Sequence, residues 1–303
     1  MARDPVTPAI ATRGLTKDFG GGRGVFDLDL SAGQGEIFGF IGPNGAGKTT
    51  TIRLLMDLLR PDRGTAAILG HDTRAESLSL KRIVGYVPGE LPQFGGLTGA
   101  EIIGLLAGMR GNVDPARVTA LADRFDLELH RRYRDLSHGN KQKVGLVQAF
   151  MHQPKILILD EPTLGLDPLL QQEFRTLLRE TIDRGASVFL SSHVLSEVEQ
   201  VCDRIAFINR GRVTRTGSLD ELRALRVHRV EVVVDTAVDR TAIARLPGVS
   251  DVVVDDRHVR CSVRGSFGPL LAALGSAAVR EIDSRELSLE ELFIAEYGDG
   301  SRV

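Results

Sequence analysis

The sequence predicts an α/β protein in which parallel strands alternate with helices, followed by a smaller α+β domain. Two apolar runs, 155–159 and 186–190, have the composition of strands buried on both faces of a sheet. A third strand-like run, 37–41, precedes a glycine-rich loop and an amphipathic helical run over 50–59. Near residue 225 the pattern changes to short strands and helices, which indicates a second domain.

The loop after the run 37–41 reads Gly42-Pro43-Asn44-Gly45-Ala46-Gly47-Lys48-Thr49-Thr50 and matches the pattern G-x-x-x-x-G-K-[ST]. Its three glycines allow positive φ and let backbone N–H groups approach an anion, beside the positive end of the next helix. Lys48 suits the β- and γ-phosphates, and the Thr49 hydroxyl suits Mg²⁺. The alternative is a glycine-rich turn that contains Lys-Thr by chance. The flanking strand and helix favour the phosphate site.

Length and composition narrow the class of protein. The chain has 303 residues, enough for two moderate domains, and its 42% apolar and 26% charged residues are ordinary for a globular protein. No run reaches about 18 uncharged apolar residues, so we expect no membrane span. The first five residues lack the apolar core of a secretory signal, so we expect the protein to stay in the cytosol.

Cysteine content and charge exclude further classes. Cys202 and Cys261 are far apart and form no C-x-x-C pair, which suits a reducing compartment and argues against a metal site built from cysteines. We interpret both as small core or surface thiols. The net charge of −2, the 5% aromatic content and the absence of Trp give no basic, aromatic surface, so we expect no nucleic-acid partner.

The segment before the loop is predicted to be a β-hairpin over 10–36 with a turn at 20–24. Such a hairpin can cover a nucleotide bound at the loop. The aromatic ring of Phe19 has two possible roles, stacking on an adenine or filling the core, and its residue type alone leaves both open. After the helix, short strands are expected at 65–70 and 83–88.

A helical insert is predicted over 98–135. Thr98 and Glu101 form a capping box, and Asp114-Pro115 offers an N-cap and first-turn pair for a helix that runs to Phe125. The following stretch, 136–143, opens another helix: Ser137 can cap it, and Gly139 allows close approach of a ligand to the backbone. Chemistry alone leaves open whether this helix start binds an anion or is only a capped helix.

Two carboxylates follow the strand 155–159, at the sheet edge where open α/β sheets bind their ligands. Asp160 suits the Mg²⁺ shell, and Glu161, which points elsewhere, suits the polarisation of an attacking water. The alternative, an acidic turn after a core strand, is disfavoured by the phosphate loop upstream. His193 follows the strand 186–190 at the same edge and is a candidate γ-phosphate ligand.

Taken together, these motifs resemble the ATP-binding subunit of ABC transporters, over about residues 8–225. The resemblance implies a P-loop NTPase fold (ABC ATPase) with a β-rich N-terminal subdomain and a helical subdomain at about 98–150. It assigns residues 42–50 to the Walker A loop, Leu136–Gln142 to the signature sequence and Asp160 to the Walker B motif.

The resemblance also implies site residues. Glu161 and His193 are the expected catalytic residues, and Thr49 and Asp160 are the expected Mg²⁺ ligands. The expected ATP contacts are Phe19, Gly42, Pro43, Asn44, Gly45, Ala46, Gly47, Lys48, Thr49, Thr50, Ser137, Gly139, Gln142 and Asp167.

In this family two such domains pair head to tail, with each ATP between the Walker A loop of one and the signature of the other. The resemblance thus favours Ser137 and Gly139 as γ-phosphate ligands in trans, and it implies a second ATP-binding subunit, expected to be another copy, since this chain holds one set of motifs. It also implies an integral membrane permease as partner. We therefore expect a cytoplasmic protein, peripheral on the inner face of the cell membrane through that permease.

Two positions depart from the family pattern. His138 replaces one glycine of the signature's usual pair and is bulkier, at a position that the family allows to vary. Gly89 occupies the position at which relatives carry a Gln that touches Mg²⁺ and the attacking water. Either a water completes the metal shell there, or nearby Glu90 or Gln93 substitutes. We expect hydrolysis to survive because Asp160, Glu161 and His193 are intact.

The C-terminal domain, 228–303, is predicted to have the order βαββαβ with a terminal helix over 288–297. No catalytic constellation is visible in it. A dimerising or stabilising role is favoured over ligand sensing. The extension and the loop at 89–90 resemble the ATPases of drug- and antibiotic-efflux exporters.

The function predicted from these features is ATP hydrolysis that powers export of a drug, antibiotic or lipid-like substrate through a separately encoded permease. One alternative is an ABC ATPase that acts on ribosomes or DNA. Such proteins usually carry two cassettes or a long coiled coil, and neither is visible here. A second alternative is a nucleotide-gated module with weak hydrolysis, which Gly89 keeps open.

Overall fold

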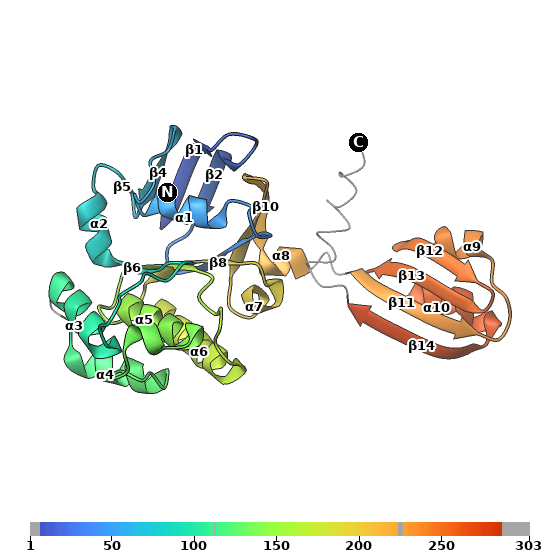
Figure 1. Ribbon diagram of the computed structural model, residues 1–303. Helices are drawn as coiled ribbons and strands as arrows, with labels where there is room; N and C mark the ends of the chain where they lie inside the picture. Colours follow the sequence, from blue (N-terminus) through green and yellow to red (C-terminus); the bar gives the residue numbers. More distant parts are fainter. Residues whose placement is uncertain (1–6, 112, 224–226, 287–303) are drawn as a thin grey trace, which may run out of the picture. The chain divides into compact units, whose positions relative to one another are not determined.

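The computed structural model describes residues 7–111, 113–223 and 227–286 (Figure 1). Contacts within the chain divide it into two compact units, Met1–Ser218 and Leu219–Val303. Each unit has its own sheet and core, and each is treated separately below.

The first unit begins with an antiparallel sheet in the order β2-β1-β4-β5. The expected hairpin is present: β1 (Ile10–Asp18) pairs with β2 (Gly24–Ala32). On its other side β1 pairs with β4 (Arg63–Ile68), which in turn pairs with the short β5 (His71–Asp72).

A six-stranded sheet in the order β10-β9-β3-β8-β7-β6 forms the centre of this unit. Strands β3, β7 and β8 are buried along their whole length, as expected for apolar strands covered on both faces. The parallel pairing of β3 with β8 and of β8 with β7 brings the ends of these strands to one edge. The strand bounds are β3 (Ile37–Ile41), β6 (Val84–Val87), β7 (Ile156–Asp160), β8 (Ser187–Ser192), β9 (Arg204–Asn209) and β10 (Arg212–Ser218).

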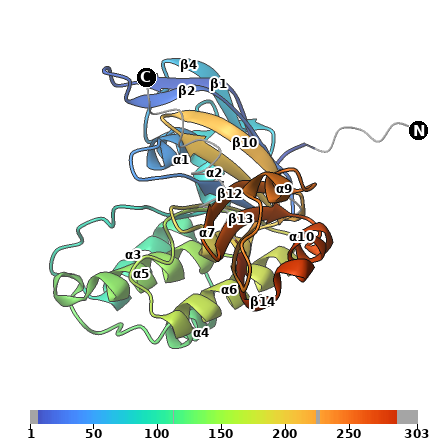
Figure 2. The same ribbon diagram turned by 90° about the vertical axis from the view of Figure 1, so that its right-hand side faces the viewer.

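Helices cover both faces of this sheet. Figures 1 and 2 show α1 between the two sheets, and α3 to α6 on the opposite side of the six-stranded sheet. The helix bounds are α1 (Lys48–Leu55), α2 (Ser77–Ile83), α3 (Gly99–Arg110), α4 (Pro115–Arg124), α5 (His138–Phe150), α6 (Pro168–Asp183) and α7 (Leu195–Glu199), with a 3₁₀ turn η1 at Tyr133–Asp135.

The predicted helix starts are confirmed where a cap defines them. Thr98 and Glu101 form the expected capping box of α3, and the Asp114 side chain accepts a hydrogen bond from the Ala116 N–H at the start of α4. The run expected to be helical to residue 59 ends earlier, at Leu55, because Asp57 takes a left-handed φ of 50°. Helix α2 was not expected from the sequence.

The second unit begins with α8 (Leu219–Arg223), and its sheet has the order β12-β13-β11-β14. Its elements follow the predicted βαββαβ order and enclose a core of valines and leucines. Cys261 is free and buried in this core, and Cys202 is free and buried in the first unit. Of the two interpretations, core or surface thiol, the core one therefore holds for both cysteines. The terminal helix expected over 288–297 lies outside the described residues. The bounds are β11 (Val227–Val234), α9 (Arg240–Ala244), β12 (Val249–Asp255), β13 (His258–Arg264), α10 (Gly268–Leu274), η2 (Gly275–Ala277) and β14 (Val279–Glu286).

Among the residues that the structure describes, no helix combines the length and the apolar character needed to cross a membrane.

A half-buried histidine connects the helical insert to the central sheet. His152, just after α5, lies with its Nε2 2.8 Å from Nη1 of Arg110, at the end of α3. The same Nη1 donates to the carbonyls of Lys81 and Val84 at 3.2 and 3.3 Å. Burial, and secondarily the charge of Arg110, lowers the pKa of His152 to about 4. The imidazole is therefore neutral in the folded chain at neutral pH.

This pKa shift predicts a loss of stability in mild acid. Between pH 6.5 and 4 the unfolded chain binds a proton at His152 that the folded chain does not, so the free energy of unfolding falls as pH falls. At pH 4.5 the loss is roughly 2 kcal/mol. Denaturant unfolding at pH 7 and pH 4.5 measures it: His152→Gln, which cannot ionise, should lose less stability between the two pH values than the wild type. His71→Gln, at an exposed position, is the control. An equal pH dependence in wild type and His152→Gln contradicts the assignment.

Candidate active site

A cleft of about 330 Å³ lies over the loop that joins β3 to α1. It brings the phosphate loop together with the hairpin residue Phe19 and the carboxylate of Glu161, which are distant in sequence. The residues that line it are Phe19, Arg23, Gly24, Asn44, Gly45, Gly47, Lys48, Thr49, Thr50, Gly89, Glu90, Glu161 and Leu164.

The loop has the backbone of an anion site, with one correction. Gly45 and Gly47 have positive φ values of 80° and 111°, as predicted, and Gly47 caps α1. The prediction of positive φ is wrong for Gly42, which does not have a positive φ. Glycine is required at this position because a β-carbon would lie 2.2 Å from the Ile208 carbonyl oxygen. Lys48 Nζ donates to the Gly42 carbonyl at 2.7 Å and to the Pro43 carbonyl at 3.2 Å. The carbonyl groups of the loop thus hold the Lys48 ammonium group in place.

Asp160 ends β7 and is fully buried. Its Oδ1 accepts a hydrogen bond from the Ser191 hydroxyl at 2.5 Å, whereas its Oδ2 has no hydrogen-bond partner within the described part of the chain. A buried carboxylate oxygen without a partner is unfavourable. The position therefore suits a cation or a bound water.

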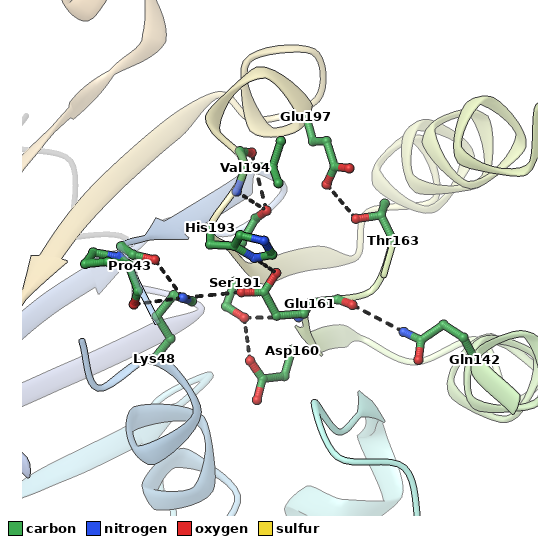
Figure 3. Close-up of polar contacts among 12 residues, drawn as sticks. Pro43, Lys48, Gln142, Asp160, Glu161, Thr163, Ser191, His193, Val194 and Glu197 are labelled. Carbon is green, nitrogen blue, oxygen red and sulfur yellow. Dashed lines mark hydrogen bonds and ion pairs between the residues drawn. The ribbon is translucent and has the colours of Figure 1, made fainter. Parts of the chain in front are cut away.

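The next residue, Glu161, turns its carboxylate the other way, into the cleft (Figure 3). Its Oε1 lies 3.3 Å from Lys48 Nζ, and its Oε2 lies 2.8 Å from Nδ1 of His193. The Glu161 side chain is only 17% exposed. A carboxylate held in this way between a lysine and a histidine can accept a proton from a water molecule at the end of a phosphate chain.

Phe19 is 49% exposed and lines the cleft, so the alternative that it fills the core is wrong. Its ring lies beside the hairpin turn, with Lys17 Nζ 6.0 Å from the ring centroid. An exposed aromatic face at the wall of the cleft can stack on a flat base.

The remaining predicted contacts do not line this cleft. Ser137 caps α5 by accepting a hydrogen bond from the Asn140 N–H at 3.2 Å, and Asp167 caps α6 through the N–H groups of Leu169 and Leu170, both at 3.0 Å. Gly139 packs against the segment before α6. Gln142 is 3% exposed and faces the interior. Pro43 and Ala46 belong to the loop, the first exposed and the second buried, without lining the cleft.

Sequence reasoning missed Ser191. It holds Asp160 through its hydroxyl and accepts from the Glu161 N–H at 3.1 Å, so it orients both acidic residues. Its position at the end of a fully buried strand, directly before Ser192 and His193, was the available signal. A polar side chain at the end of such a strand usually has a buried partner.

The loop at Gly89 lies against Asp160. A β-carbon at residue 89 would be 2.7 Å from Asp160 Oδ2. Glu90 lines the cleft, with its Oε2 3.1 Å from Arg53 on α1, whereas Gln93 is not among the lining residues. Of the two substitutes considered for the missing Gln, Glu90 is the one at the cleft.

These residues fit a Mg²⁺ ion that is shared with a nucleotide. No group of three His, Cys, Asp or Glu side chains able to hold a metal occurs in the described residues. Mg²⁺ usually takes one or two protein oxygens, with phosphate and water completing its shell. The unpartnered Oδ2 of Asp160 and the Thr49 residue that lines the cleft meet that requirement.

The chain is similar to known proteins in both sequence and fold. A match to the ABC transporter family covers residues 25–164. The chain is 33% identical to the daunorubicin resistance ATP-binding protein DrrA3 of Streptomyces coeruleorubidus, over 97% of this chain and 98% of that protein. It is 34% identical to the bacitracin transport ATP-binding protein BcrA of Enterococcus faecalis, over 96% and 97%. A solved ATP-binding subunit of an ABC transporter, 32% identical, matches with a TM-score of 0.65 over 71% of this chain and 92% of that one.

The contact at Gly89 predicts a severe effect of a small substitution. Gly89→Ala places a methyl group against Asp160 Oδ2, so it should displace the carboxylate that Ser191 anchors. ATP hydrolysis should fall roughly tenfold or more, and half-saturation should need more Mg²⁺. Gly145→Ala is the control, because its β-carbon would meet only ordinary contacts at 3.5 and 3.7 Å. Activity of Gly89→Ala within about twofold of the Gly145→Ala control would show that Asp160 needs no such space.

Proposed function

The chain is a member of the ABC transporter family of ATP-binding subunits, and from that premise we propose that its ATPase activity powers export of a drug, antibiotic or lipid-like substrate. The export pathway belongs to a separately encoded membrane permease. The proposal of ATP hydrolysis rests on the Glu161 carboxylate, which is held between Lys48 and His193 in the cleft. The whole-length match to two resistance or transport ATPases supports the export part.

In this proposal the loop and α1 hold the phosphates. The N–H groups of the loop and the N-terminal end of α1 attract the anion, and Lys48 pairs with the β- and γ-phosphates. Thr49 and Asp160 hold Mg²⁺, which neutralises part of the phosphate charge when it is bound. Phe19 stacks on the adenine.

Lys48 serves both the Glu161 carboxylate and the phosphate chain. Its Nζ lies 3.3 Å from Glu161 Oε1, and the γ-phosphate needs the same ammonium group. When the phosphate takes Lys48, the Glu161 carboxylate loses that neutralising partner and becomes free to accept a proton from water. His193, bonded to Oε2, keeps the carboxylate oriented and reaches the γ-phosphate from the end of the neighbouring strand β8.

The site is complete only with a second copy of the chain. Ser137, Gly139, Gln142 and Asp167 belong to the expected ATP contacts but lie outside this cleft, and Ser137 and Asp167 are exposed. The exposed start of α5 presents the N–H groups and positive end of a helix N-terminus to an anion on another molecule. We propose that two chains pair head to tail, so that each contributes Ser137 and Gly139 to the ATP held by the other.

The proposed location follows from the permease: the chain works on the inner face of the cell membrane, bound through that partner. Detergent extraction of membranes from cells that express the tagged full chain tests this. Co-purification of a polytopic membrane protein supports the proposal, and recovery of ribosomes or DNA in its place supports the alternative class.

Hydrolysis is tested on the purified full chain in the presence of its permease. We expect Mg²⁺-dependent release of phosphate from ATP that Glu161→Gln lowers by roughly 100-fold or more, because removal of a general base costs about that much. Wild-type release no faster than that of Glu161→Gln would refute hydrolysis at this site. The result would then favour a nucleotide-gated module.

Because the phosphate loop and the signature meet only when two chains pair, substitutions in the two segments should impair different steps. Lys48→Ala should weaken ATP binding to the monomer about tenfold or more, since hydrogen bonds to charged groups contribute roughly 1.5–3 kcal/mol. Ser137→Ala should leave monomer affinity unchanged and reduce ATP-dependent dimer formation. Equilibrium binding of a fluorescent ATP analogue and sedimentation measure the two effects. An equal loss of monomer affinity in both variants contradicts this division.

A further inference from the structure

Gln142 makes contacts that its expected role as an ATP ligand does not use. It lies in the second turn of α5 and is 3% exposed. Its amide nitrogen donates to the carbonyl oxygens of Glu161 and Pro162, at 3.3 and 3.0 Å. A primary amide has two N–H hydrogens, so both are occupied by these two carbonyls. Figure 3 shows Gln142 approaching Glu161 from the side away from Lys48.

The backbone that Gln142 contacts is strained. Glu161 has a φ of 50°, a left-handed conformation that is unfavourable for a residue with a side chain. Such a conformation persists where the surroundings hold it from several sides. Here the Glu161 N–H donates to the backbone oxygen and the hydroxyl of Ser191, and the Glu161 carbonyl accepts from Gln142. Ser191 and Gln142 therefore fix opposite ends of the same residue.

A second contact connects the start of α5 to the same segment. The backbone of Gly139 lies so close to Gly165 that a β-carbon on Gly139 would be 2.4 Å from the Gly165 carbonyl oxygen. The first two turns of α5 are thus attached to the segment 161–167 at two places. A shift of the helix start cannot leave Glu161 unaffected.

We propose that Gln142 is a positioning residue that holds the Glu161 backbone in its strained conformation and so aims the Glu161 carboxylate at the cleft. It thereby couples the start of α5, which meets the ATP of the second copy, to the base in its own cleft. This inference rests on the proposed function and assigns Gln142 a role without nucleotide contact. Because the direction of the carboxylate follows from the backbone of its own residue, loss of the Gln142 amide should misdirect the base.

The test compares two glutamines on one helix. Gln142→Met keeps the length of the side chain but removes its donor. Gln148→Met is the matched control, because the Gln148 amide also donates to a backbone carbonyl, that of Tyr86, away from Glu161. ATP hydrolysis by the full chain should show kcat reduced roughly tenfold in Gln142→Met with KM within about twofold, and little change in Gln148→Met. A rise in KM with unchanged kcat would mean that Gln142 contacts the nucleotide, and it would overturn the proposal.

A double-mutant cycle separates positioning from a general structural defect. If Gln142 acts through the Glu161 carboxylate, Gln142→Met should change the residual rate of Glu161→Gln by less than about twofold. An equal reduction in both backgrounds overturns the proposal, because it shows an effect independent of that carboxylate. Thermal unfolding of the two methionine variants should give similar midpoints.

A measurement without turnover keeps this inference separate from the proposed function. Hydrogen exchange of peptides that cover 161–167 should be roughly tenfold faster in Gln142→Met than in Gln148→Met. Unchanged exchange overturns the inference even when hydrolysis is normal. A wild-type chain without hydrolysis overturns the proposed function, and the exchange comparison then still decides whether Gln142 holds this segment.

Discussion

The parallel pairing of three buried strands is the constraint on which the site depends. Strand β8 lies between β3 and β7, with Ile41 opposite Ser192 and Asp160 opposite Ser191. The carboxyl ends of the three strands therefore meet at one edge, where open α/β sheets bind ligands. Because the strands are buried along their length, their register cannot slip without exposing apolar side chains. The apolar core thus fixes the relative positions of charged groups that come from three separate segments.

Structural features that depend only on residues close together in the chain could be predicted from the sequence. The capping box at Thr98 and Glu101, the phosphate loop at 42–50 and the acidic pair at 160–161 each follow from local hydrogen bonding or periodicity. The βαββαβ order of the second unit could also be predicted, because its strands are distinct apolar runs, whereas in the first unit α2 was missed. Features set by distant neighbours were not predictable. Gly42 illustrates this, because its lack of a β-carbon matters through the Ile208 carbonyl.

The direction in which a side chain points was the other feature that could not be predicted from the sequence. Gln142 belongs to a motif associated with ATP, yet its amide serves the backbone of its own chain. The reason is geometric: the start of α5 is exposed at Ser137 and His138, whereas one turn later the helix packs against the rest of the unit and the Gln142 side chain is buried. Every residue of α5 from Gln142 to Phe150 except Gln148 is buried, so the helix is enclosed on all sides over this stretch.

The same burial that orders the site leaves part of its charge incompletely paired by protein groups. Within the described part of the chain, the fully buried Asp160 has one oxygen without a hydrogen-bond partner, and Lys48, 6% exposed, has Glu161 as its charged partner. Burial of charge without complete pairing destabilises the folded chain, and a cation at Asp160 together with phosphate at Lys48 removes that cost. Ligand that binds only the folded chain adds its binding free energy to the stability of the fold. The incomplete pairing of the buried charges and the affinity of the site for a metal-bound nucleotide therefore have one physical origin.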